Sequence, residues 1–79
     1  MDDQYYEICI GPGPFITDED FWMCIRGARQ PSLEEAEHFY AEDVEKFGGN
    51  VLAVNLLSPS EASAFYDLSH EENWPVFGT

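Results

Sequence analysis

The chain has little positive charge. Its 79 residues contain three basic side chains (Arg26, Arg29 and Lys46) against sixteen aspartates and glutamates, and the formal net charge is −13. Because so negative a surface repels phosphate groups, direct binding to nucleic acid or to an anionic membrane is disfavoured. A net charge of magnitude about 2–8 is enough to keep a small domain soluble. The surplus therefore points to a further cause, such as a cationic partner.

Cysteine is scarce and long apolar runs are absent. Cys9 and Cys24 are the two cysteines, whereas a small secreted protein usually carries four or more in a disulfide framework. No apolar run approaches the ~20 residues that span a bilayer, and residues 1–4 are acidic where a signal peptide is basic. We therefore expect a soluble cytoplasmic protein with two reduced thiols.

Aromatic residues, in contrast, are plentiful. Six phenylalanines, four tyrosines and two tryptophans argue against disorder, since acidic disordered chains have few aromatic residues. The length predicts one compact domain over residues 1–79, without internal repeats. A core of this size gives a net stability of roughly 3–5 kcal/mol. A homodimer, or binding to a larger protein, would stabilise it further.

The first half of the chain predicts strands. Residues 4–10 alternate between Tyr6, Ile8 and Ile10 on one face and Tyr5, Glu7 and Cys9 on the other, which is a strand pattern that ends at a loop over residues 11–14. Residues 18–28 are ambiguous, because an acidic start after Thr17 suggests a helix while bulky residues 21–25 lack helical spacing. We favour a strand over residues 20–27.

The second half predicts two helices around a strand. Ser32 with Glu35, and Ser58 with Glu61, are capping boxes that begin helices. The first helix ends at Gly48-Gly49, the apolar run 51–57 suggests a buried central strand, and the second helix runs through Tyr66 and Leu68. The tail 71–77 is irregular but apolar enough to dock. The helical stripe of the first helix comprises Leu33, Ala36, Tyr40, Val44 and Phe47.

This order of elements predicts an α+β fold. A small antiparallel three-stranded sheet would carry the two helices packed on one face. If residues 18–28 were helical instead, the sheet would have two strands, which is marginal on its own.

The acids are clustered rather than dispersed. The first predicted helix has one lysine, Lys46, beside six acids, and like charges three residues apart on a helix cost ~0.2–0.5 kcal/mol per pair. Phe39 lies off the apolar stripe, beside Glu35 and Glu42, so it is a candidate aromatic anchor; Trp74 and Tyr5 are further candidates. The candidate partner-binding residues are Glu34, Glu35, Glu37, Phe39, Glu42, Asp43, Glu45, Asp18, Glu19 and Asp20.

Two simple explanations of the acidity stay open, a solvated acidic face and adaptation to high salt. A sharper hypothesis is DNA mimicry. Carboxylates one or two helical turns apart, at ~5.4 Å per turn, can meet a groove built for phosphates spaced ~3.4 Å along each strand.

In size, charge, scarcity of lysine and clustering of acids, the chain resembles small acidic inhibitors that phages and mobile elements make against restriction enzymes or CRISPR complexes. The resemblance implies a non-enzymatic inhibitor that presents a DNA-mimicking surface to a basic nucleic-acid-binding protein or complex. It includes no motif that can be aligned, so no functional residue is transferred. The alternative is an acidic regulatory or adaptor protein, antitoxin-like, that binds a basic partner.

Motifs for other chemistry are missing from the sequence. Cys9, Cys24, His38 and His70 are too far apart for a zinc pair, and residues 18–20 lack the glycine and final glutamate of a calcium loop. The prolines of the loop 11–14 remove the N–H donors that bind phosphate. We therefore expect no metal, no cofactor and no catalytic residue.

Overall fold

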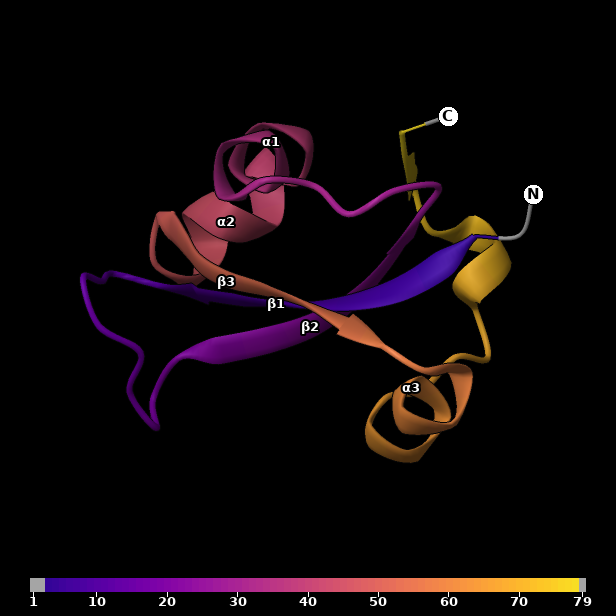
Figure 1. Ribbon diagram of the computed structural model, residues 1–79. Coiled ribbons are helices and arrows are strands. Elements are labelled where there is room, and N and C mark those ends of the chain that lie inside the picture. Colours follow the sequence, from indigo (N-terminus) through magenta and orange to yellow (C-terminus); the bar gives the residue numbers. More distant parts are fainter. Residues whose placement is uncertain (1–2, 79) are drawn as a thin grey trace.

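The computed structural model describes residues 3–78, so residues 1, 2 and 79 of the predicted domain lie outside the described part. The fold is α+β, as the sequence predicts (Figure 1). Its elements, in chain order, are β1 (Gln4–Gly11), β2 (Phe21–Gly27), α1 (Leu33–Phe39), α2 (Ala41–Phe47), β3 (Asn50–Leu57), α3 (Pro59–Phe65), a 3₁₀ helix (Glu71–Asn73) and β4 (Val76–Phe77).

The sheet has four strands in the order β3-β1-β2-β4, where three were predicted. β1 is antiparallel to both β2 and β3, whereas β4 runs parallel to β2 and pairs with Arg26 and Gly27. A strand of two residues is too short to show periodicity, so no sequence pattern predicted β4. The predicted central position of β3 is also wrong: β1 is central, and β3 lies at an edge.

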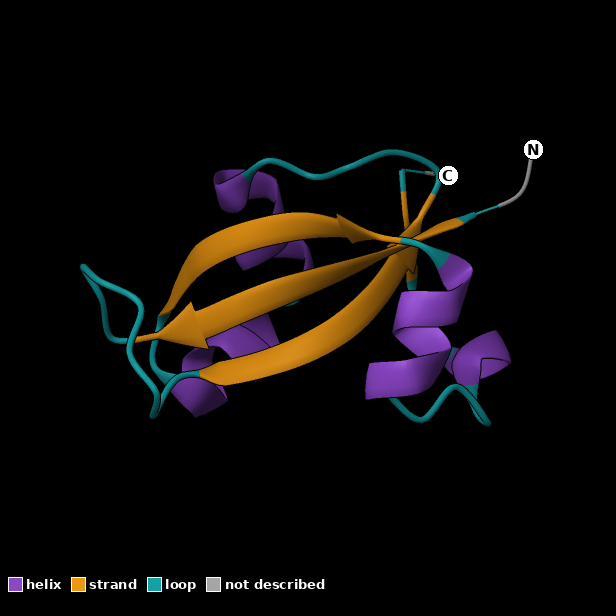
Figure 2. Cartoon of the chain, turned by 60° about the horizontal axis from the view of Figure 1, so that its bottom comes forward, coloured by secondary structure: helices purple, strands orange, loops and turns teal. Residues whose placement is uncertain are grey.

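The helices cover both faces of the sheet, which corrects the prediction of one covered face. In Figure 1, α1 and α2 lie above the sheet and α3 lies below it, and Figure 2 shows the same division from another side. On the first face, Ile8 packs in one cluster with Ala36 and Val44. On the second, Leu57 packs with Ala62 of α3. Both faces of β1 carry apolar residues, so alternation alone could not assign α3 to a side.

The predicted helix over residues 33–47 is broken at Tyr40. The Tyr40 backbone (φ −107°, ψ 36°) lies outside the helical region and separates α1 from α2. Neither proline nor glycine marks this position, and the Tyr40 side chain is 6% exposed. Packing of a buried ring, rather than a local signal, accompanies the break. The predicted stripe is therefore imperfect, and Leu33 is 46% exposed.

Both predicted capping boxes are present, at Ser32 with Glu35 and at Ser58 with Glu61. The helix that begins after Ser58 ends at Phe65, earlier than predicted. Tyr66 and Leu68 follow it and pack against the second cluster. The strand favoured for residues 20–27 is confirmed as β2. The apolar tail docks as expected, with Phe77 7% exposed.

Candidate partner-binding surface

Three of the ten candidate residues form hydrogen bonds within the fold through their carboxylates. Glu35 accepts two hydrogen bonds from the Arg29 guanidinium, at 2.7 and 3.1 Å, and a third from the Ser32 backbone N–H at 3.0 Å. The Arg29 contact first, and the Ser32 bond second, lower the pKa of Glu35 to about 2. Because Arg29 and Glu35 form an ion pair, the charge of this carboxylate is balanced locally.

Glu37 and Asp20 are used in a similar way. A Glu37 carboxylate oxygen accepts the backbone N–H of Val51 at 3.1 Å, which ties α1 to β3. An Asp20 oxygen accepts the backbone N–H of Thr17 at 2.7 Å and closes the turn before β2. A partner that recruited either carboxylate would have to break these bonds. Their presence in the acidic clusters is therefore explained by folding.

The other six acids carry charge that folding leaves unused. Within residues 3–78, no hydrogen bond or ion pair involves any of their carboxylates, and Arg29–Glu35 is the single ion pair. Lys46 lies on α2, and its Nζ is 5.3 Å from the centre of the Phe47 ring. Asp43 is half-buried and the rest are exposed. The six are Asp18, Glu19, Glu34, Glu42, Asp43 and Glu45.

Three hollows adjoin along the seam between α1–α2 and the C-terminal segment 74–77, and together we call them the acidic groove. The Phe77 hollow, of about 400 Å³, is lined by Ser32, Glu34, Glu35, His38, Phe39 and Phe77. The middle hollow, of about 270 Å³, is lined by residues 39–43 and Pro75. The Trp74 hollow, of about 180 Å³, is lined by residues 23–25, Tyr40, Asp43, Trp74 and Pro75.

Shared walls join the hollows. Phe39 borders the Phe77 hollow and the middle hollow, and Tyr40, Asp43 and Pro75 border both the middle and the Trp74 hollow. Phe39 is 42% exposed, and its ring meets that of Phe77 edge-on at a centroid distance of 5.4 Å. An aromatic side chain therefore stands among carboxylates, an arrangement that suits cationic side chains.

The two ends of the acidic groove differ in charge. At the Phe77 hollow, the Arg29 guanidinium lies 4.8 Å from the centre of the Phe77 ring and pairs with Glu35. At the middle and Trp74 hollows, Glu42 and Asp43 contribute carboxylates, and no arginine or lysine is among the described residues that line them. The unbalanced negative charge of the acidic groove is thus concentrated at its α2 end.

The structure brings five of the ten candidates into the acidic groove and leaves five outside it. Those inside are Glu34, Glu35, Phe39, Glu42 and Asp43. Glu45 lies on α2 away from these hollows, Glu37 bonds to β3, and residues 18–20 belong to the connection between β1 and β2. That connection projects beyond the sheet at the left of Figure 2.

The sequence did not place several wall residues of the acidic groove. Trp74 was a candidate anchor, but Pro75, Phe77 and Tyr40 carried no functional signal. The one relevant signal was the apolar tail. The sequence predicted that this tail docks on the domain but did not predict its position. Because the tail lies more than thirty residues after α1 in the chain, periodicity could not connect the two.

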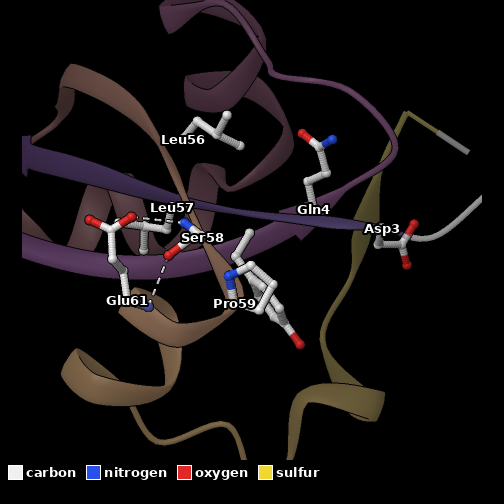
Figure 3. A pocket seen from close by; sticks show the side chains of 8 residues that line it. Asp3, Gln4, Leu56, Leu57, Ser58, Pro59 and Glu61 are labelled. Atoms are coloured by element: carbon white, nitrogen blue, oxygen red, sulfur yellow. Dashed lines mark hydrogen bonds between the residues drawn. The ribbon is translucent and has the colours of Figure 1, made fainter.

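A larger hollow, of about 450 Å³, opens where the start of β1 meets the end of β3 and the start of α3 (Figure 3). It is lined by residues 3–5, residues 56–59 and Glu61, none of them among the ten candidates. Figure 3 shows Glu61 bonded to Ser58, and this bond is the capping box of α3 (3.0 Å to the Ser58 N–H). Leu56 is 57% exposed at its rim.

The two cysteine thiols lie in the interior of the fold. Burial first, and then the charges of Glu7 and Glu71, raise the pKa of Cys24 to about 11. Both cysteines are free and buried, so neither thiol ionises near neutral pH, and the thiolate is the nucleophilic form. Within residues 3–78, no group of three or more His, Cys, Asp or Glu side chains could hold a metal ion.

Comparison of the chain with protein families, curated proteins and solved structures finds no match. In the described part of the chain, no helix combines the length and the apolar character needed to cross a membrane.

Proposed function

We propose that this protein is a non-enzymatic inhibitor that presents an acidic, DNA-mimicking surface to the nucleic-acid-binding groove of a bacterial defence complex, either a CRISPR effector or a restriction enzyme. One observation carries the proposal. Six carboxylates, four of them on α1 and α2, have no cationic or hydrogen-bonding partner among residues 3–78. An ordinary solvated helix interleaves lysines that turn such repulsion into attraction.

The charge balance supports this function over a simple solvated face. Folding uses Glu35, Glu37 and Asp20 and leaves Glu34, Glu42 and Glu45 exposed. A basic groove would gain ion pairs with these carboxylates without breaking any bond of the fold. Attraction between opposite charges speeds association and is screened by salt.

The experiment compares two double variants with the same change in net charge. Glu42→Gln with Glu45→Gln neutralises α2, whereas Asp3→Asn with Glu72→Gln neutralises residues far from it in the chain. A panel of purified CRISPR effectors and restriction enzymes is assayed for DNA binding and cleavage with each protein. We expect the wild type to inhibit a member of the panel, the α2 variant to inhibit at least about tenfold less, and the control to resemble the wild type.

Two further readouts decide between mimicry and other inhibition. Excess target DNA should displace the protein, and raising salt from about 50 to 200 mM should weaken binding at least tenfold. Inhibition that is indifferent to salt, or equal loss in both double variants, would contradict the proposal.

The acidic groove favours a second candidate, an antitoxin-like regulatory or adaptor protein that caps a basic partner. Phe39 and Trp74 line it with apolar surface, which an adaptor can bury against its partner in addition to forming ion pairs. An adaptor differs from a mimic because its partner can still bind DNA while it is attached. An electrophoretic assay in which protein, partner and DNA migrate as one complex would support this second function.

A further inference from the structure

We propose that the Trp74 hollow is a socket for an arginine side chain of the basic partner. The inference rests on the proposed function, because it assigns the chemistry by which that partner is held. The hollow of about 180 Å³ lies where the edge of β2, α2 and the C-terminal segment meet. Four of its walls, Met23, Ile25, Trp74 and Pro75, offer apolar surface to the stem of a long side chain.

Charge decides which side chain the socket fits. Asp43 is the carboxylate on its wall, and within residues 3–78 it has neither an ion pair nor a hydrogen bond. Glu42 adds a second carboxylate in the adjoining middle hollow. Among residues 3–78, Arg29 is held by Glu35, and neither Arg26 nor Lys46 forms an ion pair with Asp43 or Glu42. A cation that enters from a partner therefore meets carboxylates that no ion pair of the fold balances.

The aromatic wall favours arginine over lysine. A planar guanidinium can stack on an indole such as that of Trp74 while it forms two parallel hydrogen bonds with one carboxylate, and an ammonium cannot do both. Arginine is also the side chain that nucleic-acid-binding grooves commonly supply. A second copy of this chain is a poor occupant, since both copies carry a charge of −13.

Tyr40 adds an independent sign of an unfilled site. Its side chain is 6% exposed, and its hydroxyl has no hydrogen-bond partner among the described residues. Burial first, and then the neighbouring Cys24, raise the pKa of this hydroxyl to about 12. Tyr40 is itself one of the residues that line the Trp74 hollow. Buried hydroxyls are normally paired, and a guanidinium has five N–H donors to offer.

The test needs no knowledge of the target. The probe is the tripeptide acetyl-Gly-Arg-Gly-amide, titrated at low salt into the ¹⁵N-labelled full-length chain. The readout is the indole N–H resonance of Trp74, with Trp22 as the internal reference. We expect Trp74 to shift and saturate with a Kd of about 1 mM, while Trp22 stays in place. The citrulline tripeptide, equal in shape and uncharged, should bind at least about tenfold more weakly, and the lysine tripeptide about threefold more weakly.

Two variants of α2 provide matched controls. Asp43→Asn should weaken the arginine probe about threefold to fivefold, the range of a partly exposed ion pair, whereas Glu45→Gln removes the same charge outside the hollow and should change it less than twofold. Equal binding of arginine and citrulline by the wild type would overturn the proposal without reference to any variant. Equal effects of the two variants, or equal shifts of both tryptophans, would also overturn it.

The outcome is separable from the fate of the proposed function. If the probe fails to move Trp74 while the double variant of Glu42 and Glu45 abolishes inhibition, the socket is wrong and the acidic surface stands. If the probe binds as expected but no effector is inhibited, the socket stands and the inhibitor function is wrong.

Discussion

On the face of the sheet that α1 and α2 cover, β1 contributes Tyr6, Ile8 and Ile10, each 3% exposed or less. On the face that α3 covers, the same strand contributes Tyr5, Glu7 and Cys9. The first face thus forms a continuous apolar core with the helices above it. The second face is smaller and mixed, because Glu7 accepts a hydrogen bond from the Tyr66 hydroxyl at 3.1 Å.

The mixed face also uses a carboxylate from the tail. The Tyr5 hydroxyl donates a hydrogen bond to Glu71, which ties the 3₁₀ helix to β1. The comparison shows that the carboxylates of Glu7 and Glu71, on the α3 face, accept hydrogen bonds that stabilise the fold. The unused acids of α1 and α2 lie above the apolar core, so their removal should change binding more than stability. Three predictions test this division, beginning with the largest expected effect.

The first prediction compares one core residue from each face. Ile8→Ala removes a fully buried side chain from the apolar face and should cost about 2–5 kcal/mol, as much as the ~3–5 kcal/mol expected for the whole domain. Leu57→Ala, on the α3 face, should cost less, since its smaller cluster can collapse around the gap. Urea denaturation followed by circular dichroism measures both. A more stable Ile8→Ala than Leu57→Ala would contradict the division.

The second prediction concerns the polar link of the mixed face. Tyr66→Phe removes the hydrogen bond to Glu7 and should destabilise the protein by about 1 kcal/mol. Tyr6→Phe is the matched control, because its hydroxyl bonds to Gln4 at a longer 3.2 Å and to an uncharged group. Burial first, and then the bond to Glu7, raise the pKa of Tyr66.

The pH dependence of the same link has a definite sign. The pKa of Tyr66 is higher in the folded than in the unfolded state. The contribution of its hydroxyl to the free energy of unfolding is therefore complete below the unfolded pKa of about 10 and is lost as pH rises further. The free energy of unfolding of the wild type should therefore fall above about pH 10 more steeply than that of Tyr66→Phe. Parallel curves would show that the Tyr66 hydroxyl does not couple to folding.

The third and smallest effect concerns a carboxylate above the apolar core. The hydrogen bond from Arg29, and to a lesser extent that from Ser32, lowers the pKa of Glu35 to about 2. The contribution of this carboxylate to the free energy of unfolding is therefore complete above the unfolded pKa of about 4.3 and is lost as pH falls towards 2. Relative to Glu35→Gln, the wild type should lose melting temperature between about pH 4.5 and 2. Glu34→Gln, the exposed neighbour, is the control and should follow the wild-type profile.

Local signals in the sequence were reliable guides to the elements. Alternation predicted β1, and the two capping boxes at Ser32 and Ser58 marked where α1 and α3 begin. Each of these signals depends on residues within a few positions of one another. The side of the sheet that α3 covers, the break at Tyr40 and the pairing of β4 depend on packing between distant segments, and no local pattern encodes them.

The candidate site divides in the same way. The sequence by itself determined that the chain is strongly acidic, that its acids cluster, and that Phe39 lies among them. The capping box already assigned Glu35 a role in the fold, but only the tertiary structure decided the use of other carboxylates whose partners are distant in the chain: Val51 is fourteen residues from Glu37, and Tyr66 is fifty-nine from Glu7. Composition fixes how much charge a chain carries, but only folding determines which of that charge is balanced from within.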